Sequence, residues 1–345
     1  MILVTLSVII VFVGMCKKEE LGLILNSLAA MLLGYVLDMM FGEMESQYSL
    51  TKLVSAIANT LKDKFKNRYV SSHEGQTLAG SLLLAVMLLI FVTPAVLLLV
   101  FSYKLHKIVG VLVEALIIFG VINEKKVGSY SSGILKALRK GKPLAARRKL
   151  SFLTDEDVTG LREEGITKLS VRAIAENTFE NAVAPLFFVF IGGGIGGLVY
   201  LVINKTAKAV KHEDIYFSLT PRGMNDVFGF IPARIAAFLT VKDSRLLALD
   251  FVNAQSVWKR DGRNLKSING SQTVAAFAGA LDIEVVGDTY ADEAFIPYEH
   301  IGDPKKDLDQ SDIYYAQQLS YGAVFIAVTV FALIKLALGV IAALL

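Results

Sequence analysis

This sequence of 345 residues has one cysteine, four histidines and a small net charge, and each of these low values excludes a class of protein or site. The single cysteine, Cys16, cannot form an internal disulfide and has no partner for a structural zinc site. The net charge of +3 is too small to indicate binding to nucleic acid. None of the histidines has a His or Cys at metal-ligand spacing, so surface or loop positions are expected for His73, His106, His212 and His300.

Apolar residues dominate the composition. They make up 54% of the chain, charged residues only 19%, and the mean hydropathy of +0.54 is too high for a soluble globule of this length. We therefore predict an all-α, polytopic membrane protein, a single domain of residues 1–345 built as a helical bundle with large, mostly helical loops. The predicted membrane segments are 2–15, 21–41, 81–101, 105–122, 183–203 and 320–345.

Two long polar stretches flank the apolar segment 183–203. Residues 123–182 carry 12 Lys or Arg residues, and residues 204–319 carry 13. If the apolar segment crossed the bilayer once, the two stretches would lie on opposite sides and one would violate the positive-inside rule. The segment is therefore expected to enter the membrane and return, or to lie buried among other helices. Both stretches are expected to face the cytoplasm, in a multi-pass protein of the cell membrane.

Asp38, Glu114 and Lys335 are charged residues that fall inside predicted membrane segments. Asp38 lies close to the end of its segment and is either an interfacial carboxylate or a residue that faces a cavity. Glu114 lies in mid-segment, where an ionisable residue is a functional candidate by default. The equal alternative is a carboxylate neutralised by protonation or by one hydrogen bond inside the bundle. Lys335 lies inside the last segment or extends its ammonium group to the interface.

The apolar segment 183–203 contains a glycine-rich run, Ile-Gly-Gly-Gly-Ile-Gly-Gly, at residues 191–197. Such a run permits close packing of helices, its commoner use, or a broken helix that lines a cavity. It is not a nucleotide fingerprint, because no strand precedes it and its spacing matches neither a Walker nor a dinucleotide loop.

Polar and charged residues are concentrated at the boundary between the charged loop and this apolar segment, from Ser170 to Phe188. Glu176, Asn177 and Glu180 lie here within about one helical turn of each other. Carboxylates are costly in hydrocarbon unless they face a protein interior or a wet cavity. The motif therefore predicts a polar cavity at the membrane edge.

After residue 204 the chain has the polar composition of a soluble protein. A helix is expected from Pro221 through Leu239. A loop rich in Arg, Lys, Ser, Asn and Gly follows at residues 258–271 and leads into a small-residue helix at 274–281. Free N–H groups and the positive end of the helix dipole favour an anion at such a place. The loop is therefore suited to phosphate, with a capped surface turn as the alternative.

Taken in chain order, these motifs resemble the adenosylcobinamide-phosphate synthase family of cobalamin biosynthesis, whose members are membrane proteins. The resemblance extends over most of the chain. The segments that carry it are Leu37 to Glu43, Ala146 to Asp157, Ala175 to Phe187, Gly192 to Asn204, Asn225 to Arg234, Arg260 to Leu281, Gly302 to Pro304, and Asp312 with Ile313.

The resemblance implies an ATP- and Mg²⁺-dependent amide ligation that joins a propionate carboxylate of adenosylcobyric acid to an aminopropanol, usually as its O-phosphate. The implied partners are these substrates, the lipid bilayer and other membrane enzymes of the late pathway, with no nucleic acid. The implied catalytic residues are Glu176, Asn177 and Asp226, and the implied Mg²⁺ ligands are Glu176, Asp157, Asp226 and Asp261. The residues implied to bind phosphate or orient substrate are Arg234, Arg260, Arg263, Ser267, Asn269 and Asn204.

Several polar positions depart from the family pattern. Asp155-Glu156-Asp157 stands where the family has Gly-Arg-Asp, Ala207 and Asn225 each stand where it has an Asp, and Gly229 replaces an Asn. Two other functions therefore stay open: a non-catalytic paralogue that binds a corrinoid, and a membrane sensor or transporter of the same superfamily. Binding of ATP with Mg²⁺ separates these classes from the synthase.

Overall fold

The computed structural model of the chain describes residues 18–42, 49–68, 72–265, 267–287, 289–291, 294–296 and 300–344. The predicted membrane segment 2–15 lies outside the described residues. The described helices and strands are α2 (Lys18–Phe41), α3 (Leu50–Arg68), α4 (His73–Leu105), α5 (Lys107–Val121), α6 (Glu124–Leu138), α7 (Pro143–Leu150), α8 (Glu163–Thr178), the π-helix η1 (Phe179–Val183), α9 (Ala184–Ala209), α10 (Ile215–Leu246), α11 (Phe251–Asp261), α12 (Ile268–Leu281), β1 (Thr289–Ala291), β2 (Ala294–Ile296) and α13 (Ser311–Leu344).

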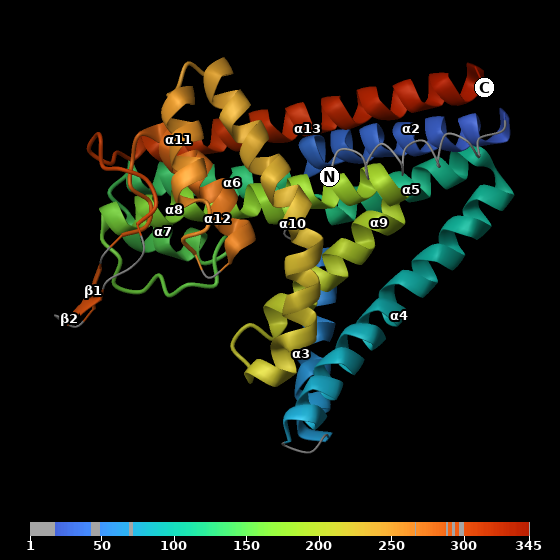
Figure 1. Cartoon of the computed structure of the whole chain (residues 1–345), viewed down its shortest axis with the longest axis horizontal. Coiled ribbons are helices and arrows are strands. Elements are labelled where there is room, and N and C mark those ends of the chain that lie inside the picture. The colour runs from blue at the N-terminus through green and yellow to red at the C-terminus, as the bar shows by residue number, and fades with distance from the viewer. Residues whose placement is uncertain are drawn as a thin grey trace.

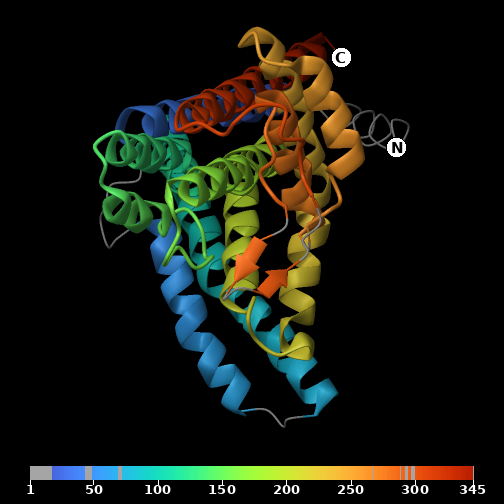
Figure 2. The same ribbon diagram turned by 90° about the vertical axis from the view of Figure 1, so that its left-hand side faces the viewer.

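Two groups of helices meet at an angle. Helices α13, α2, α5 and the first part of α9 run along the long axis of the molecule, and α3, α4, the second part of α9 and part of α10 descend from them (Figure 1). Figure 2 shows the descending group from the side, with α3 and α4 reaching farthest from the rest. Helices α11 and α12 and the antiparallel pair β1–β2 gather at one end of the long axis.

The described chain contains five helices long and apolar enough to cross a membrane, so it is an all-α, multi-pass membrane protein, as predicted. They are Gly22–Phe41, His73–Leu105, Glu163–Ala209, Ile215–Leu246 and Ser311–Ile341. The fourth was missed in the sequence: α10 extends beyond the expected helix 221–239 at both ends, and Asp214 caps its start by accepting from the Tyr216 N–H at 2.8 Å. The predicted segment 105–122 is the shorter helix α5, of 15 residues.

Three apolar cores connect these helices. The first joins α6, α7, α8, α11, α12 and the start of α13; the second joins α2, α5, η1, the first part of α9, α10 and α13; the third joins α3, α4 and the second part of α9. The amphipathic helix α3 lies on the protein, because Ile57, Leu61 and Phe65 pack against the third core.

Helix α9 reverses direction within the glycine-rich run. Gly192 and Gly193 have non-helical backbone angles, and the positive φ of Gly193, +61°, is one that residues other than glycine rarely adopt. In a straight helix, Phe188 and Tyr200 would lie about 18 Å apart at 1.5 Å per residue, yet their rings stack with centroids 5.3 Å apart. The segment is therefore a hairpin of two helical arms, residues 184–191 and 194–209. Gly192 and Gly193 form the break, while Gly196 and Gly197 let the second arm pack closely against Phe188 and Val189 of the first, so the run serves both predicted uses.

Asp38, Glu114 and Lys335, which lie inside predicted membrane segments, are buried and hydrogen-bonded. Asp38 is fully buried and accepts from the Lys125 N–H at 3.2 Å, so it is not an interfacial carboxylate. Glu114 is 5% exposed and hydrogen-bonded inside the bundle, which was one of the two alternatives. Lys335 is 7% exposed and donates to Ser27 Oγ at 2.6 Å, so its ammonium group does not extend to an interface.

Candidate functional site

The polar motif at residues 170–188 folds into the end of α8 and the single π-helical turn η1. The wider turn frees the carbonyl of Asn181 from its helical partner, and this carbonyl accepts from the Asn123 N–H at 3.0 Å. Such π turns are rare and are found frequently at functional sites. This turn lies where the first core meets the second and carries Glu180 on the same face as Glu176.

Charged groups from the second arm of the hairpin and from α8 meet beside η1. Lys208 Nζ lies 2.6 Å from the Glu180 carboxylate, and Lys205 Nζ donates to Asn181 Oδ1 at 3.0 Å. Arg172 bridges Glu176 at 3.1 Å and Glu156 at 2.8 Å. We call this group the polar cluster; it consists of Glu156, Arg172, Glu176, Glu180, Asn181, Asn204, Lys205 and Lys208.

The buried edge of the polar cluster contains oxygen atoms without a hydrogen-bond partner in the described chain. Asn204 is 1% exposed and donates its amide to Asn225 Oδ1 at 3.2 Å, while its own Oδ1 is unpaired. The hydroxyl of Tyr200, one turn earlier on the same arm, is buried and unpaired as well. A buried polar atom left unpaired costs about 1–3 kcal/mol, so both oxygens are candidates for contact with water or a ligand.

The N-terminus of α12 closes the polar cluster from the other side. Ser267 caps this helix by accepting from the Gly270 N–H at 3.3 Å, and Asn269 donates to the carbonyl of Asp226 on α10 at 2.8 Å. A Cβ added to Gly270 would lie 3.7 Å from Glu176 Cγ, so the positive end of the helix faces this carboxylate. Gly229 lies beside the Asn269 amide, where a side chain would leave little room.

Arg234 of α10 and Arg263, five residues before the start of α12, lie close to each other. The guanidinium of Arg234 lies 3.5 Å above the ring centre of Phe230 and donates to the Phe230 carbonyl at 2.6 Å. Arg263 is exposed, makes no hydrogen bond or ion pair with the described residues, and is close enough to Arg234 for mutual repulsion. Two neighbouring guanidinium groups without carboxylate partners suit an anion with several oxygens, such as a phosphate.

The carboxylates predicted to bind Mg²⁺ are not gathered in one place. Among the residues that the structure describes, no group of three or more His, Cys, Asp or Glu side chains is arranged to hold a metal. Asp157 is exposed, and both of its oxygens accept from the Thr159 hydroxyl, at 2.7 and 2.8 Å; hydrogen bonds from Thr159 lower the pKa of this carboxyl. Asp226 is exposed near Arg222 on α10.

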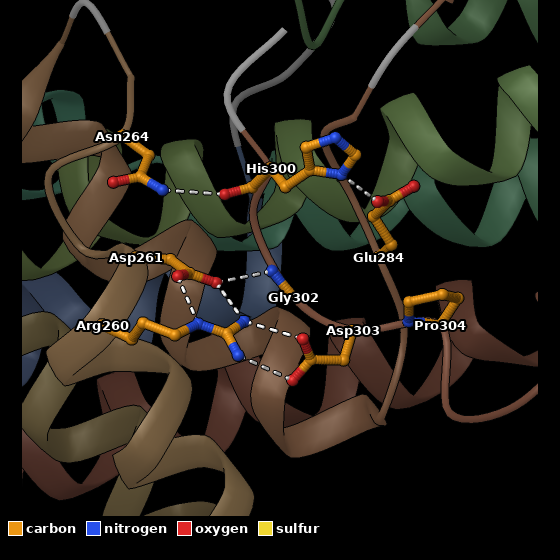
Figure 3. A pocket seen from close by; sticks show the side chains of 8 residues that line it. All are labelled: Arg260, Asp261, Asn264, Glu284, His300, Gly302, Asp303 and Pro304. Atoms are coloured by element: carbon orange, nitrogen blue, oxygen red, sulfur yellow. Dashed lines mark hydrogen bonds and ion pairs between the residues drawn. The ribbon is translucent and has the colours of Figure 1, made fainter.

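Asp261 belongs to a different, closed network at the end of α11 (Figure 3). It is 3% exposed, is gripped by Arg260 through contacts of 2.6 and 2.7 Å, and accepts from the Gly302 N–H at 3.0 Å. Arg260 also contacts Asp303, at 2.9 Å. Together with Asn264, Glu284, His300 and Pro304 these residues line a pocket of about 490 Å³. The hydrogen bonds to Asp261 raise the pKa of Arg260 further above its usual range.

Asn177, a predicted catalytic residue, is used in the fold. It is 8% exposed, and its amide donates to the carbonyls of Leu153 at 2.8 Å and Ala173 at 2.7 Å. Asn181 in turn donates to its side-chain oxygen. The side chain thus ties the loop before α8 to the helix that carries Glu176, and any part it takes in chemistry stays a prediction.

The sequence predictions included some residues of the polar cluster and missed others. Glu176 and Asn204 were predicted, whereas Arg172, Asn181, Lys205 and Lys208 were not. A signal was present: Arg172, Glu176 and Glu180 are spaced four residues apart, which places them on one face of a helix. The opposite lysines could be found only through the hairpin, since 28 residues separate Glu180 from Lys208.

The departures from the family pattern have local explanations in the structure. Glu156, which stands where the family has Arg, pairs with Arg172 at 2.8 Å. Asn225, which stands where the family has Asp, accepts from Asn204. Ala207 is buried against its neighbours. The substitutions therefore leave a self-consistent set of contacts around the polar cluster.

These features define a polytopic helical membrane protein with a charged site between the arms of a broken helix and the start of α12. The family described as CobD/Cbib protein matches residues 31–320, and the chain belongs to this family.

Curated relatives align along nearly their whole length. A cobalamin biosynthesis protein CobD of Clostridium perfringens is 30% identical over 317 residues, covering 90% of this chain and 98% of the relative. A CobD of Geobacter metallireducens is 31% identical, covering 86% and 92%, and a cobalamin biosynthesis protein CbiB of Salmonella arizonae is 27% identical, covering 88% and 96%. No solved structure matches the chain.

Proposed function

We propose that the chain is an adenosylcobinamide-phosphate synthase of cobalamin biosynthesis. The observation that carries this proposal is the convergence of acidic and basic side chains from α8, η1 and α9, with polar side chains of α10 and the start of α12 beside them, in a member of the CobD/Cbib family. The relatives' names refer to cobalamin biosynthesis, and they align over most of this chain.

The proposed reaction needs a site for several anions at once. A carboxylate oxygen of adenosylcobyric acid attacks the γ-phosphorus of ATP, giving an acyl phosphate and ADP. The amine of aminopropanol phosphate then attacks the acyl carbon, loses a proton and expels phosphate, which leaves with the electrons of the C–O bond. Cations and free backbone N–H groups are the means by which a protein assembles such charges.

The polar cluster and its surroundings supply these groups. Lys208 and Arg172 would bind nucleotide phosphates, and Arg234 and Arg263 with the start of α12 would bind the phosphate of the amine. ATP enters as its Mg²⁺ complex, and such an ion is usually held by phosphates and one or two carboxylates. Glu176 would be the carboxylate that binds this ion. One carboxylate is enough for such a complex, so the four predicted Mg²⁺ ligands need not lie together, and in the structure they do not.

The site is proposed to face the cytoplasm, where ATP is available. The hairpin arms begin and end at the polar cluster, so the polar stretches on both sides of α9 reach the same region of the molecule. A cysteine at Lys142 and one at Lys259, each introduced into a Cys16→Ser background, should react only with reagents that cross the membrane. Labelling of either from outside would contradict this orientation.

The test is synthesis by the purified protein in detergent or nanodiscs. The protein is supplied with adenosylcobyric acid, aminopropanol phosphate and MgATP, and the amide product is detected by mass spectrometry. Lys208→Met should reduce kcat/KM by about 10- to 100-fold, because it removes a charge-assisted contact worth about 1.5–3 kcal/mol. Lys211→Met, an exposed lysine three residues later, is the matched control and should behave as wild type.

One result would overturn the proposal. A wild-type protein that binds the corrinoid but neither binds MgATP nor forms amide would be a non-catalytic paralogue. Complementation of a strain that lacks the synthase, scored for growth on cobyric acid, tests the same activity in the cell.

A further inference from the structure

The break in α9 leaves backbone groups that need partners deep in the molecule. Around Gly192 and Gly193 the regular i to i−4 hydrogen bonds stop, so the first arm ends in carbonyls and the second begins with N–H groups. Within a membrane, non-helical backbone is tolerated only where protein or a polar cavity satisfies it. Side chains from neighbouring helices provide such partners here.

Glu114 satisfies the start of the second arm. Its Oε1 accepts from the Gly194 N–H at 3.0 Å, and its Oε2 accepts from the hydroxyl of Tyr103 on α4 at 2.5 Å. A Cβ on Gly193 would collide with the same carboxylate, so glycine is required by space as well as by its φ. The negative carboxylate therefore lies at the positive end of the second arm.

Lys335 satisfies the end of the first arm. Its Nζ lies 3.4 Å from the carbonyl of Val189, four residues before Gly193, and 2.6 Å from Ser27 Oγ on α2. The Ser27 hydroxyl also lies beside Gly193. The positive ammonium group thus lies at the negative end of the first arm, and each broken helix end faces a charge of the opposite sign.

We propose that Glu114 and Lys335 are positioning residues that fix the angle between the two arms of α9 and thereby align the polar cluster. The arms lead from this turn to Glu180 on one side and Lys208 on the other, whose side chains meet at 2.6 Å. An arm that rotates at the turn separates these groups. The consequence for synthesis rests on the proposed function, whereas the consequence for arm geometry does not.

Arm geometry is tested by cross-linking cysteines at Glu180 and Lys208 with a short bis-methanethiosulfonate reagent, in a Cys16→Ser background inserted in nanodiscs. The two long side chains meet at their tips, so a reagent with a spacer replaces a direct disulfide, whose geometry requires closer backbones. The pair should cross-link readily in this background. Lys335→Met leaves Glu114 as a buried charge without its counterpart and should slow cross-linking several-fold. Glu114→Gln with Lys335→Met should restore most of the rate, because the amide oxygen still accepts from Gly194 and no lone charge stays buried.

Two further variants keep the test decisive. Ser27→Ala removes one partner of Lys335 and serves if Lys335→Met does not insert. Thr329→Val, an exposed position whose hydroxyl contacts only its own helix, is the control and should leave the rate unchanged. Unchanged cross-linking in both Lys335→Met and Ser27→Ala would overturn the proposal.

Activity gives a second readout in the chain with its native Glu180 and Lys208. Misalignment at the polar cluster should lower kcat per inserted molecule by about 10- to 100-fold, since small displacements of reacting groups carry such costs, with KM for MgATP changed much less. A role limited to stability would lower the amount of inserted protein and leave kcat intact. Altered cross-linking in a protein without any synthase activity would support the positioning role while refuting the proposed function.

Discussion

The polar cluster and the network around Asp261 contain the same kinds of charged residue, but they differ in how completely these residues are paired and buried. At Asp261, a buried carboxylate is gripped by Arg260 and a backbone N–H, and the second side of the arginine is taken by Asp303 (Figure 3). The carboxylates differ in exposure: the side chain of Asp261 is 5% exposed and that of Glu176 is 29% exposed, whereas the cations Arg260 and Lys208 are 52% and 36% exposed. Both regions come from motifs of the family resemblance.

The difference separates a structural role from a chemical one. A buried, fully paired carboxylate has no capacity left for a ligand, and loss of its partner leaves an uncompensated charge. A carboxylate that is partly open to solvent, such as Glu176, exchanges partners at smaller cost, because a pair open to solvent contributes little stability. Arg260 and Asp261 are therefore expected to hold α11 to the loop at Gly302, while Glu176 and Lys208 can turn to a substrate.

The largest effect on folding is expected for Arg260→Met. It leaves the buried Asp261 without its cation and should lower the free energy of unfolding by about 1–3 kcal/mol, less than for a fully buried pair because Arg260 itself is 52% exposed. Activity per folded molecule should stay at the wild-type level. Thermal unfolding in detergent and assays normalised to folded protein measure both, with Arg260→Lys as the milder control. A loss of specific activity without a loss of stability would assign this network to the site.

Arg263→Ala should show the reverse pattern. Arg263 makes no contact with the described residues that the fold would lose, so stability should not change. KM for aminopropanol phosphate should rise about 10- to 150-fold through loss of a charge-assisted contact worth about 1.5–3 kcal/mol. The nearby Lys259→Ala is the control, and KM for the unphosphorylated amine should be unaffected. An equal rise for both amines would remove Arg263 from the phosphate site.

Glu124 offers a buried carboxylate with no cation, in contrast to Asp261. It is 1% exposed, accepts from Ser320 at 2.7 Å, and its second oxygen has no partner in the described chain. Burial, together with the charge of Asp38, raises its pKa from 4.5 to about 8. Between these values the unfolded chain releases a proton that the folded chain keeps, so stability falls as pH rises from about 5 to 8.

Glu124→Gln should remove this dependence. The variant is expected to have a Tm within a few degrees of wild type near pH 5 and to exceed it at pH 8, where wild type contains a carboxylate that resists ionisation. Thermal unfolding across this pH range gives the comparison. Parallel profiles for the two proteins would show that Glu124 is already ionised in the fold.

Asp157→Asn should have the smallest effect. Both carboxylate oxygens contact Thr159 in an exposed turn, and the side chain reaches no other described residue. Activity with MgATP should stay within about twofold of wild type, as is usual for surface substitutions. A strong loss that excess Mg²⁺ reverses would restore Asp157 to the metal site that the family resemblance implied.

Much of the fold could be predicted from hydrophobic runs in the sequence, whereas the packing of segments that are distant in the sequence could not. The segments at 21–41 and 81–101 lie within α2 and α4, and the described part of the segment at 320–345 lies within α13, because uninterrupted apolar runs predict membrane helices well. Helix α10 was missed because prolines and charges interrupt it, and its burial depends on packing against α12 and the arms of α9.

The site could be predicted only in part for the same reason. Glu176 stood out as a carboxylate at a membrane edge, and the loop before α12 as a place for anions. The lysines opposite depend on the reversal at Gly193, which the sequence indicated only through the glycine-rich run and the conflict between two positively charged stretches. Periodicity also cannot tell whether a carboxylate such as Asp261 is fully paired. Gly302 donates to it and Asp303 pairs with its partner Arg260, and both residues come from a distant part of the sequence.

The most direct test of the account is Glu176→Gln. Its partner Arg172 keeps Glu156, so insertion and thermal unfolding should match wild type. We expect kcat/KM for the synthase reaction to fall by about 100- to 1000-fold, the usual effect of removing one preorganised charged group from a site. Glu164→Gln, exposed in the first turn of the same helix, is the matched control and should retain full activity. Synthase activity in Glu176→Gln within a few fold of wild type would contradict the assignment of the site to the polar cluster.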